Sequence, residues 1–282
     1  MTDRAKPSLP DDLRTRVDAI VDEMATFDRI VVAFSGGVDS SVVAALADRT
    51  LGDDAVAVTA VSETLAGREL EEARQIADEI GIRHETMAFS ELDDPRFRAN
   101  TPSRCFFCQS MRFQQLSEIA ERIDCEVLAS GTNASDTGDH RPGLEAMDQQ
   151  GVYQPLMHHD IPKQGVRTLA RWLELSVWDK PAMACLSSRI PHGNEVTEQK
   201  LRRIERAETA LHDRDFRQFR VRDHEGLARI EVGPDELDRL LAPELLADLA
   251  ADIRAAGFAS VTVDMHGYRS GSLNPPDADD DS

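Results

Sequence analysis

The chain has 282 residues, 41% of them hydrophobic, and its 52 acidic and 32 basic residues leave a formal net charge of −20. That length allows one large domain with a small one. No run of about 18 apolar residues could span a bilayer, and the first residues lack the apolar segment of a secretory signal, so we expect a globular, cytoplasmic protein with no membrane partner. The excess of acidic residues disfavours a nucleic-acid partner, because clustered Lys and Arg residues bind its phosphates. An aspartate-rich, lysine-poor composition is also typical of halophilic proteins, whose surface charge is screened by salt.

The first half of the chain alternates helices with short apolar strands. Helical periodicity predicts helices at about 10–27, 40–51, 67–81 and 106–123, the last just past a Cys-x-x-Cys pair. Apolar runs rich in β-formers predict strands at 29–34, 55–61 and 82–89, and a further strand that begins at Cys125 and runs into a polar loop. Strands that alternate with helices predict an α/β fold, a parallel sheet with helices on both faces.

The pattern changes after a further helix at about 163–175 and a loop-rich stretch at 176–193. Beyond it the sequence predicts helices at about 197–211 and 234–257 and strands at 216–224, 227–233 and 260–267. We therefore predict a first domain over 1–192, a smaller α/β domain over 193–273 and a disordered acidic tail over 274–282.

The strongest motif is Ser35-Gly36-Gly37-Val38-Asp39-Ser40, between the first strand and the next helix. Glycines let backbone N–H groups approach an anion, the helix N-terminus favours negative charge, and Ser35, Ser40 and Ser41 add hydroxyl donors. The Gly-Lys-Ser/Thr ending of a Walker loop is absent. Asp39 would repel phosphates, so we interpret it as a ligand of Mg²⁺ that contacts a nucleotide; the alternative is an ordinary turn with Asp39 as the helix N-cap.

This hexapeptide resembles the pyrophosphate loop of the PP-loop ATP pyrophosphatases, which include NAD and GMP synthetases and tRNA thiolases. The resemblance implies that ATP is cleaved between its α and β phosphates, that a substrate oxygen is adenylated and that pyrophosphate leaves. A second loop, Gly131-Thr132-Asn133, follows a later predicted strand. Open α/β sheets bind ligands at the carboxyl ends of their strands, so both loops are expected to bind ATP with Mg²⁺.

Three further stretches, "RCFFC" (104–108), "DHRPG" (139–143) and "WDKPAMACLSSRIPHG" (178–193), resemble in order and wording the LarE family of sulfur transferases. The resemblance covers nearly the whole chain. It implies ATP-dependent adenylation of a carboxylate of pyridinium-3,5-biscarboxylic acid mononucleotide and its conversion to a thiocarboxylate, in the biosynthesis of the nickel-pincer nucleotide of lactate racemase. It also implies that Cys185 carries the sulfur. The alternatives are a PP-loop tRNA thiolase and a non-catalytic adenine-nucleotide-binding protein.

The Cys-x-x-Cys pair, Cys105 and Cys108, distinguishes two kinds of member within the resembled family. Members with the single cysteine sacrifice its sulfur, whereas members with the added pair are thought to hold a [4Fe-4S] cluster, here on Cys105, Cys108 and Cys185, whose open iron receives sulfide or sulfur from a donor protein. Three thiolates can hold three corners of such a cluster. Zinc, with His192 or Cys125 as a fourth ligand, and a dithiol redox pair stay open. Cys125 is otherwise expected to be buried and structural.

Four arginines, a serine and a lysine complete the candidate residues. Ser188 and Arg189 follow Cys185, and the planar fork of Arg189 suits a phosphate or carboxylate of the substrate. Arg220 and Arg222 alternate on one predicted strand and therefore share a face, where they bind either the substrate or surface carboxylates. Arg104 and Lys180 are weaker candidates. The predicted catalytic set is Cys185, Asp39, Ser188 and Arg189. The expected partners are a small-molecule nucleotide, a sulfur donor and further copies of the chain in a homo-oligomer.

Overall fold

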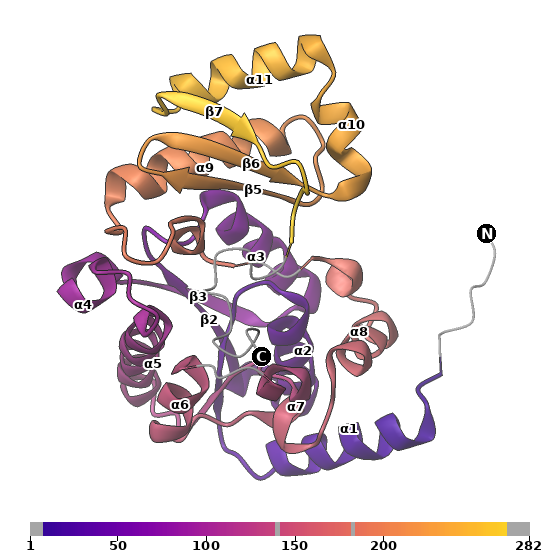
Figure 1. Cartoon of the computed structure of the whole chain (residues 1–282). Helices are drawn as coiled ribbons and strands as arrows, with labels where there is room; N and C mark the ends of the chain where they lie inside the picture. Colours follow the sequence, from indigo (N-terminus) through magenta and orange to yellow (C-terminus); the bar gives the residue numbers. More distant parts are fainter. Residues whose placement is uncertain (1–7, 139–141, 182–183, 270–282) are drawn as a thin grey trace, which may run out of the picture. The chain divides into compact units, whose positions relative to one another are not determined.

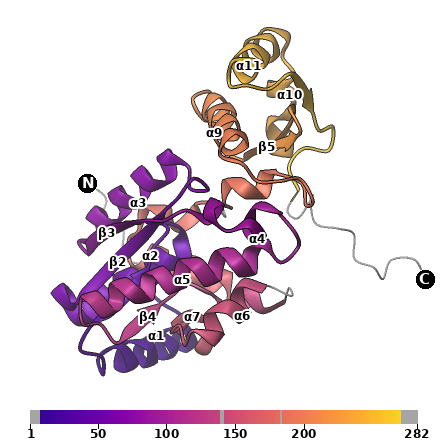
Figure 2. The ribbon, with the colours of Figure 1, turned by 90° about the vertical axis from the view of Figure 1, so that its left-hand side faces the viewer.

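The computed structural model describes residues 8–138, 142–181 and 184–269 and divides the chain into two compact units, shown in Figures 1 and 2. The first unit comprises Met1–Ser90 and Cys105–Met183, and the second comprises Glu91–Arg104 and Ala184–Ser282. Within the described ranges, no helix combines the length and the apolar character needed to cross a membrane.

The first unit contains a four-stranded parallel sheet. Its strands are β1 (Ile30–Ala33), β2 (Ala55–Val61), β3 (Arg83–Ala88) and β4 (Val127–Ala129), in the spatial order β3-β2-β1-β4. Ile30 lies opposite Ala55 of β2 and opposite Val127 of β4, which places β1 between them. Because all neighbours are parallel, the loops that follow β1 and β4 leave the sheet at the same edge and side by side. The predicted parallel sheet is confirmed.

Helices cover both faces of this sheet, as the sequence predicted. They are α1 (Asp11–Met24), α2 (Val38–Leu51), α3 (Gly67–Ile80), α5 (Arg104–Arg122), α6 (Pro142–Gln149), α7 (Pro155–His158) and α8 (Lys163–Trp172). Alternate residues of a strand point to opposite faces: Ile30 and Val32 pack with α1, α2, α3 and α8, whereas Val31 packs with α5, which crosses the sheet in Figure 2. A strand buried on both faces explains the continuous apolar run of β1.

The second unit is a smaller α/β structure. It contains α4 (Pro95–Arg98), α9 (Glu198–His212), β5 (Phe219–His224), β6 (Leu227–Val232), α10 (Leu237–Leu240), α11 (Pro243–Ala255) and β7 (Ser260–Val263). The strand order is β5-β6-β7, antiparallel between β5 and β6 and parallel between β6 and β7. One face of α9 is buried, through Leu201, Ile204, Ala207 and Leu211.

The limits of the two units differ from the predicted domains in two places. Residues 91–104 belong to the second unit, and the second long segment of that unit begins at Ala184 rather than at 193. Asn100 explains both differences: its buried side-chain amide donates to the carbonyls of Ile190 (3.2 Å), Pro191 (2.8 Å) and Asn194 (2.9 Å). These hydrogen bonds join residues about 90 positions apart, so local sequence patterns do not reveal them. Whether the predicted domains fold independently stays a prediction.

Several predicted element limits were wrong. The helix expected at 234–257 is interrupted before Pro243, which has no N–H to donate and holds Ala242 out of helical geometry, at φ −58° and ψ 125°. Strand β4 begins at Val127 rather than at Cys125, and α8 ends at Trp172. Helices α4, α6 and α7, of eight residues or fewer, are too short to show a helical period. Residues 139–141 of "DHRPG" and the predicted acidic tail lie outside the described residues.

Candidate functional site

The glycine loop and the loop after β4 touch each other within the first unit. A Cβ atom on Gly131 would lie 2.5 Å from the backbone nitrogen of Ser40 and 2.8 Å from the carbonyl carbon of Asp39, so only glycine fits between the two loops. Gly36 has a φ of +66°, and a Cβ there would lie 2.7 Å from the backbone of Ala73 in α3. The two candidate loops of the sequence therefore form one surface at the carboxyl edge of the sheet, between β1 and β4.

The start of α2 presents main-chain N–H groups of the kind that suit an anion. Its N-cap residue, Gly37, gives no side-chain cap, and among the described residues no acceptor lies within hydrogen-bond range of the N–H groups of Val38, Asp39 and Ser40. The hydroxyls of Ser35 and Ser40 lie 3.1 Å apart, and the Ser40 hydroxyl donates to the Gly37 carbonyl, which holds the turn in shape. Aligned N–H donors at a helix N-terminus favour a phosphate.

Asp39 lies at the centre of this surface. Its Oδ1 accepts a hydrogen bond from the Asn133 side chain at 3.2 Å, and its Oδ2 pairs with the ammonium of Lys163 at 2.5 Å. Asn133 is itself fixed, because its amide also donates to Asp136 (2.9 Å) and its carbonyl oxygen accepts from the N–H of Ser135 (2.9 Å). Carboxylate and amide oxygens suit Mg²⁺, so the residue types at Asp39 fit the expected cation.

Two lysines contact this surface, and the sequence reasoning missed one of them. Lys163, the first residue of α8, pairs with Asp39, although it lies in a region that no motif marked. Lys180, treated as a weaker candidate, donates to the carbonyl of Gly36 at 3.1 Å and pairs with Glu72 at 2.7 Å. A signal was present in the composition: the chain has only four lysines among 32 basic residues, and two of them reach the glycine loop.

The hydroxyls of two other predicted nucleotide-binding residues, Ser41 and Thr132, do not face the loop surface. The Ser41 side chain is fully buried, and its hydroxyl has no hydrogen-bond partner among the described residues, because α2 turns it toward the core rather than toward the loop. Its predicted role as a phosphate donor receives no support from this position. Thr132 turns its hydroxyl toward Ser130 (3.0 Å) and the sulfur of Met147, so its contribution to the loop surface is through the main chain.

In the second unit, the predicted residues of "ACLSSR" and of β5 come together. Cys185 is half-buried just before a 3₁₀ turn at Leu186–Arg189, with its sulfur 3.0 Å from the Ser187 hydroxyl. Arg222 of β5 donates to the Ser188 carbonyl at 3.0 Å and pairs with the fully buried Glu231 at 2.8 Å. The turn that carries Cys185 is therefore bound to the sheet of this unit.

Arg189 has a different position from the one the sequence suggested. Its side chain is 1% exposed and forms two parallel bonds of 2.9 Å to Glu208, a residue that the sequence reasoning missed. Its remaining terminal nitrogen donates to the carbonyl of Cys185 and the hydroxyl of Ser188. Burial raises the pKa of a carboxyl, but the charge and hydrogen bonds of Arg189 hold the pKa of Glu208 below its ordinary value. Arg189 thus positions the main chain at Cys185, and a direct contact with substrate stays a prediction.

Arg220 is the least buried of the three arginines, and its role in anion binding stays a prediction. It is half-buried and lies over the ring of Tyr268 at 5.2 Å. Burial, together with the positive charge of Arg189, lowers the pKa of its guanidinium. A phosphate or carboxylate beside Arg220 would relieve both effects, because it supplies the opposite charge.

The four cysteines differ in exposure. Cys105 and Cys108 lie inside α5 rather than before it, three residues apart on one helix face; Cys105 is exposed, whereas Cys108 is buried and lies 3.6 Å from Arg112. Cys125 donates to the carbonyl of Val127, and burial raises the pKa of its thiol, as expected for a structural cysteine. Within the described ranges, no three His, Cys, Asp or Glu side chains are grouped to hold a metal ion.

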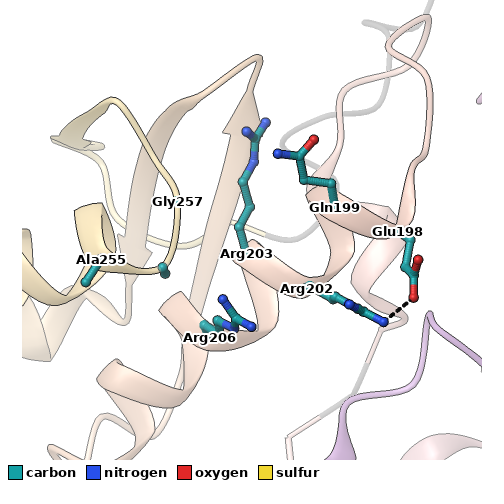
Figure 3. Close-up of a pocket in the computed structure, with 8 residues that line it drawn as sticks. Glu198, Gln199, Arg202, Arg203, Arg206, Ala255 and Gly257 are labelled. Atoms are coloured by element: carbon teal, nitrogen blue, oxygen red, sulfur yellow. Dashed lines mark hydrogen bonds and ion pairs between the residues drawn. The ribbon is translucent and has the colours of Figure 1, made fainter.

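A cavity of about 380 Å³ in the second unit lies outside the predicted site. It is lined by α9 and the end of α11, and three arginines of α9 face it (Figure 3). Arg202 pairs with Glu198, and Arg203 binds both oxygens of Asp223. Two of the three guanidinium groups therefore have carboxylate partners, and none of the predicted site residues line the cavity.

Comparisons with a family model and with known proteins show which families this chain is similar to. The asparagine synthase family matches residues 12–100, which contain the glycine loop. An uncharacterized protein of Synechocystis sp. is 40% identical over 93% of this chain and 98% of its own length. The pyridinium-3,5-bisthiocarboxylic acid mononucleotide synthase of Lactiplantibacillus plantarum is 33% identical over 93% of this chain and 95% of its own length.

A tRNA-specific 2-thiouridylase, MnmA of Beijerinckia indica, is 34% identical but over only 54% of this chain and 44% of its own length. The likeness to the thiouridylase is thus partial, whereas the likeness to the Lactiplantibacillus synthase extends over both units. The chain therefore belongs to the LarE family of sulfur transferases, the family of that synthase.

Proposed function

We propose that the chain is an ATP-dependent sulfur transferase that adenylates a carboxylate of pyridinium-3,5-biscarboxylic acid mononucleotide and converts it to a thiocarboxylate, in the biosynthesis of the nickel-pincer nucleotide. The observation that carries the proposal is the placement of Asp39 between two touching loops at the start of α2, in a chain that aligns over 93% of its length with the synthase.

The chemistry has two steps that balance. In the first, a carboxylate oxygen of the substrate attacks the α-phosphorus of ATP, pyrophosphate leaves and an acyl adenylate forms. In the second, a sulfur nucleophile attacks the acyl carbon, AMP leaves with the former carboxylate oxygen, and cleavage of the bond between sulfur and its carrier leaves the thiocarboxylate. The products are therefore AMP and pyrophosphate.

The residues divide between these steps. The N–H groups at the start of α2, with Ser35 and Ser40, bind the leaving pyrophosphate, since they are aligned before the nucleotide arrives. Asp39 would hold Mg²⁺, which neutralises phosphate charge when bound, and the Asn133 amide, which donates to Oδ1 of Asp39, would orient that carboxylate. Arg220 binds an anionic group of the substrate, and Arg189 positions the main chain of Cys185, the proposed sulfur carrier.

We also propose that Cys105, Cys108 and Cys185 hold a [4Fe-4S] cluster as the renewable sulfur carrier. Three thiolates suit a cluster with one open iron; Cys105 and Cys108 belong to the first unit and Cys185 to the second. Without the cluster, the sulfur of Cys185 would be consumed in a single turnover. Iron content and repeated turnover distinguish the two carriers.

The deciding experiment is anaerobic incubation of the purified chain with the biscarboxylated nucleotide, ATP, Mg²⁺ and sulfide, followed by mass spectrometry. The expected product has one carboxylate oxygen replaced by sulfur, with one AMP formed for each exchange. ATP hydrolysis without sulfur in the product, or no pyrophosphate release at all, would refute the function.

The partial match to the thiouridylase supports a second candidate, the tRNA thiolase. Its prediction is distinct: tRNA from a deletion strain would lack a thionucleoside. Because that match omits nearly half of the chain, we prefer the nucleotide substrate, and an unchanged set of thionucleosides in the deletion strain is the expected result.

A further inference from the structure

Both carboxylate oxygens of Asp39 are occupied by groups of the protein itself. The Lys163 ammonium lies 2.5 Å from Oδ2, and the Asn133 amide lies 3.2 Å from Oδ1. The Lys163 and Asp39 side chains are 32% and 25% exposed, so the pair is reached by solvent. The protein therefore neutralises, with its own lysine, the aspartate that our proposed function assigns to Mg²⁺.

A cation that binds Oδ2 of Asp39 competes with the ammonium of Lys163. Mg²⁺ binds carboxylate oxygens at about 2.0–2.1 Å, and a second positive charge at hydrogen-bond distance from the same oxygen would repel it. If Lys163 withdrew with nothing in exchange, however, Asp39 would be left as a bare negative charge beside the incoming phosphates. At Oδ2, binding of the ion and departure of the lysine are therefore coupled.

The backbone of Lys163 is anchored, so the change is confined to its side chain. Its N–H donates to the Ser135 hydroxyl at 3.0 Å, and the N–H of Ala134 donates to the Ile161 carbonyl at 3.0 Å, which ties the start of α8 to the Asn133 loop. From this fixed point a flexible four-carbon stem carries the ammonium. A small rotation can move the charge from Asp39 to a phosphate above the same loop.

The choice of lysine supports exchange rather than a static pair. The chain's buried, fixed pairs use arginine: Arg189 with Glu208, Arg222 with Glu231 and Arg203 with Asp223. The planar fork of arginine suits one fixed geometry, whereas lysine is a mobile point charge. Of the chain's four lysines, Lys180 also pairs with a carboxylate, that of Glu72, but Lys163 is the one that pairs with the aspartate of the glycine loop.

We propose that Lys163 is a phosphate-binding residue that exchanges partners: it neutralises Asp39 while the nucleotide is absent and transfers to a phosphate of ATP when Mg²⁺ takes the carboxylate. The inference rests on the proposed use of ATP and Mg²⁺. It adds a named residue to the site and an order of events, because free Mg²⁺ must compete with an intramolecular ammonium whereas Mg²⁺ with ATP offers that ammonium a new partner.

The test measures metal binding and nucleotide binding separately in the full chain. Mn²⁺, as a spectroscopic substitute for Mg²⁺, is titrated without nucleotide and followed by electron paramagnetic resonance. The α,β-methylene analogue of ATP, whose α–β bridge resists cleavage, is titrated with Mg²⁺ in a calorimeter. Lys163→Met is compared with the wild type and with Lys200→Met, a matched control because Lys200 lies on α9 of the second unit and its ammonium donates to the Glu195 carbonyl of the same unit.

The exchange predicts effects of opposite sign. Lys163→Met should bind Mn²⁺ about 2- to 5-fold more tightly, since it removes a competing, exposed ion pair, and should bind the ATP analogue about 10-fold or more weakly, since it loses a charged contact to phosphate. Lys200→Met should change neither. Equal analogue affinities in wild type and Lys163→Met, or Mn²⁺ binding that also weakens, would overturn the exchange.

Binding by Lys163→Arg and thermal unfolding of each variant separate a lost phosphate contact from a lost fold. Lys163→Arg keeps the charge and should recover most of the analogue affinity, whereas a failure to recover any would show that Lys163 acts only through loop structure and would refute the proposal. Thermal unfolding identifies a variant that has lost its fold. If the wild type binds no ATP analogue at all, the proposed function fails; if it binds the analogue but Lys163→Met binds it equally well, only the exchange fails.

Discussion

Replacing Glu208 with glutamine tests whether the buried Arg189–Glu208 pair maintains the second unit. Glu208 is 2% exposed and accepts three hydrogen bonds, two of 2.9 Å from Arg189 and one of 3.0 Å from the N–H of Val221. Glutamine keeps the shape but removes the charge and one acceptor, so the Arg189 guanidinium stays buried without an anion. Breaking a buried pair from one side costs about 3–5 kcal/mol, and we expect a loss near 3 kcal/mol.

The assay is urea unfolding of the full chain, followed by circular dichroism, with Glu198→Gln as the control. Glu198 also pairs with an arginine, Arg202, but their side chains are 51% and 65% exposed, so its loss should cost at most about 0.5 kcal/mol. A loss below about 1 kcal/mol for Glu208→Gln, or equal losses in the two variants, would refute the reasoning, because burial would then carry no penalty for the unpaired charge.

The same pair predicts a dependence on pH. The pKa of Glu208 in the folded chain lies below its ordinary value of 4.5, so the unfolded chain takes up its proton first as the pH falls. The stabilisation is therefore complete above pH 4.5 and is lost as the pH falls from 4.5 through the lower folded-state pKa. Glu208→Gln should lose this part of the acid dependence. An unfolding free energy that falls identically with pH in both proteins would contradict the assignment.

Three further predictions concern the loops and the cysteines. Gly131→Ala would place a Cβ 2.5 Å from the Ser40 nitrogen, so we expect a loss of about 1–3 kcal/mol in unfolding free energy and weaker binding of the ATP analogue by calorimetry. Gly233→Ala is the control: its Cβ would meet no atom closer than 3.5 Å, and nucleotide binding should be unchanged. Lys180→Met removes the link between the Gly36 carbonyl and Glu72 and should raise the KM for ATP about 10-fold with little change in kcat; an unchanged KM would show that the loop needs no such support. Anaerobically purified wild type should contain iron and absorb broadly in the visible range, and Cys105→Ala, Cys108→Ala or Cys185→Ala should abolish both signals while Cys125→Ala leaves them; a metal-free wild type with repeated turnover would exclude the cluster as sulfur carrier.

The elements that could be read from the sequence are those with a local cause. Strand β1 and helix α2 follow from an apolar run, a glycine pair and a helical period within about 20 residues, and the parallel sheet follows from repetition of that unit. The glycine loop and the Gly131–Asn133 loop were found for the same reason, since each begins within two residues of the end of a strand, β1 or β4. The break before Pro243 also has a local cause, and the sequence reasoning overlooked it.

The contacts that could not be read from the sequence join residues far apart in the chain. Lys163 and Asp39 are separated by 124 positions, and Asn100 and Ile190 by 90. Lysine at the start of a helix and asparagine in a loop are common at the surface, so neither residue type indicated its partner. The position of Arg189 was misjudged for a related reason: an arginine close to the proposed sulfur carrier, Cys185, suggests an anion site, but its guanidinium pairs with Glu208, 19 positions away.

The sequence by itself determined the fold class, the nucleotide loop and the family resemblance, because period, glycine placement and motif order are properties of the chain read locally. Only the tertiary structure decided which charged groups meet. It placed Lys163 and Asn133 on Asp39, turned Arg189 toward Glu208 and assigned residues 91–104 to the second unit. The physical reason is that a charge buried on folding must find an opposite charge or a hydrogen-bond partner, and which partner lies within reach depends on the packing of whole elements rather than on neighbouring residues.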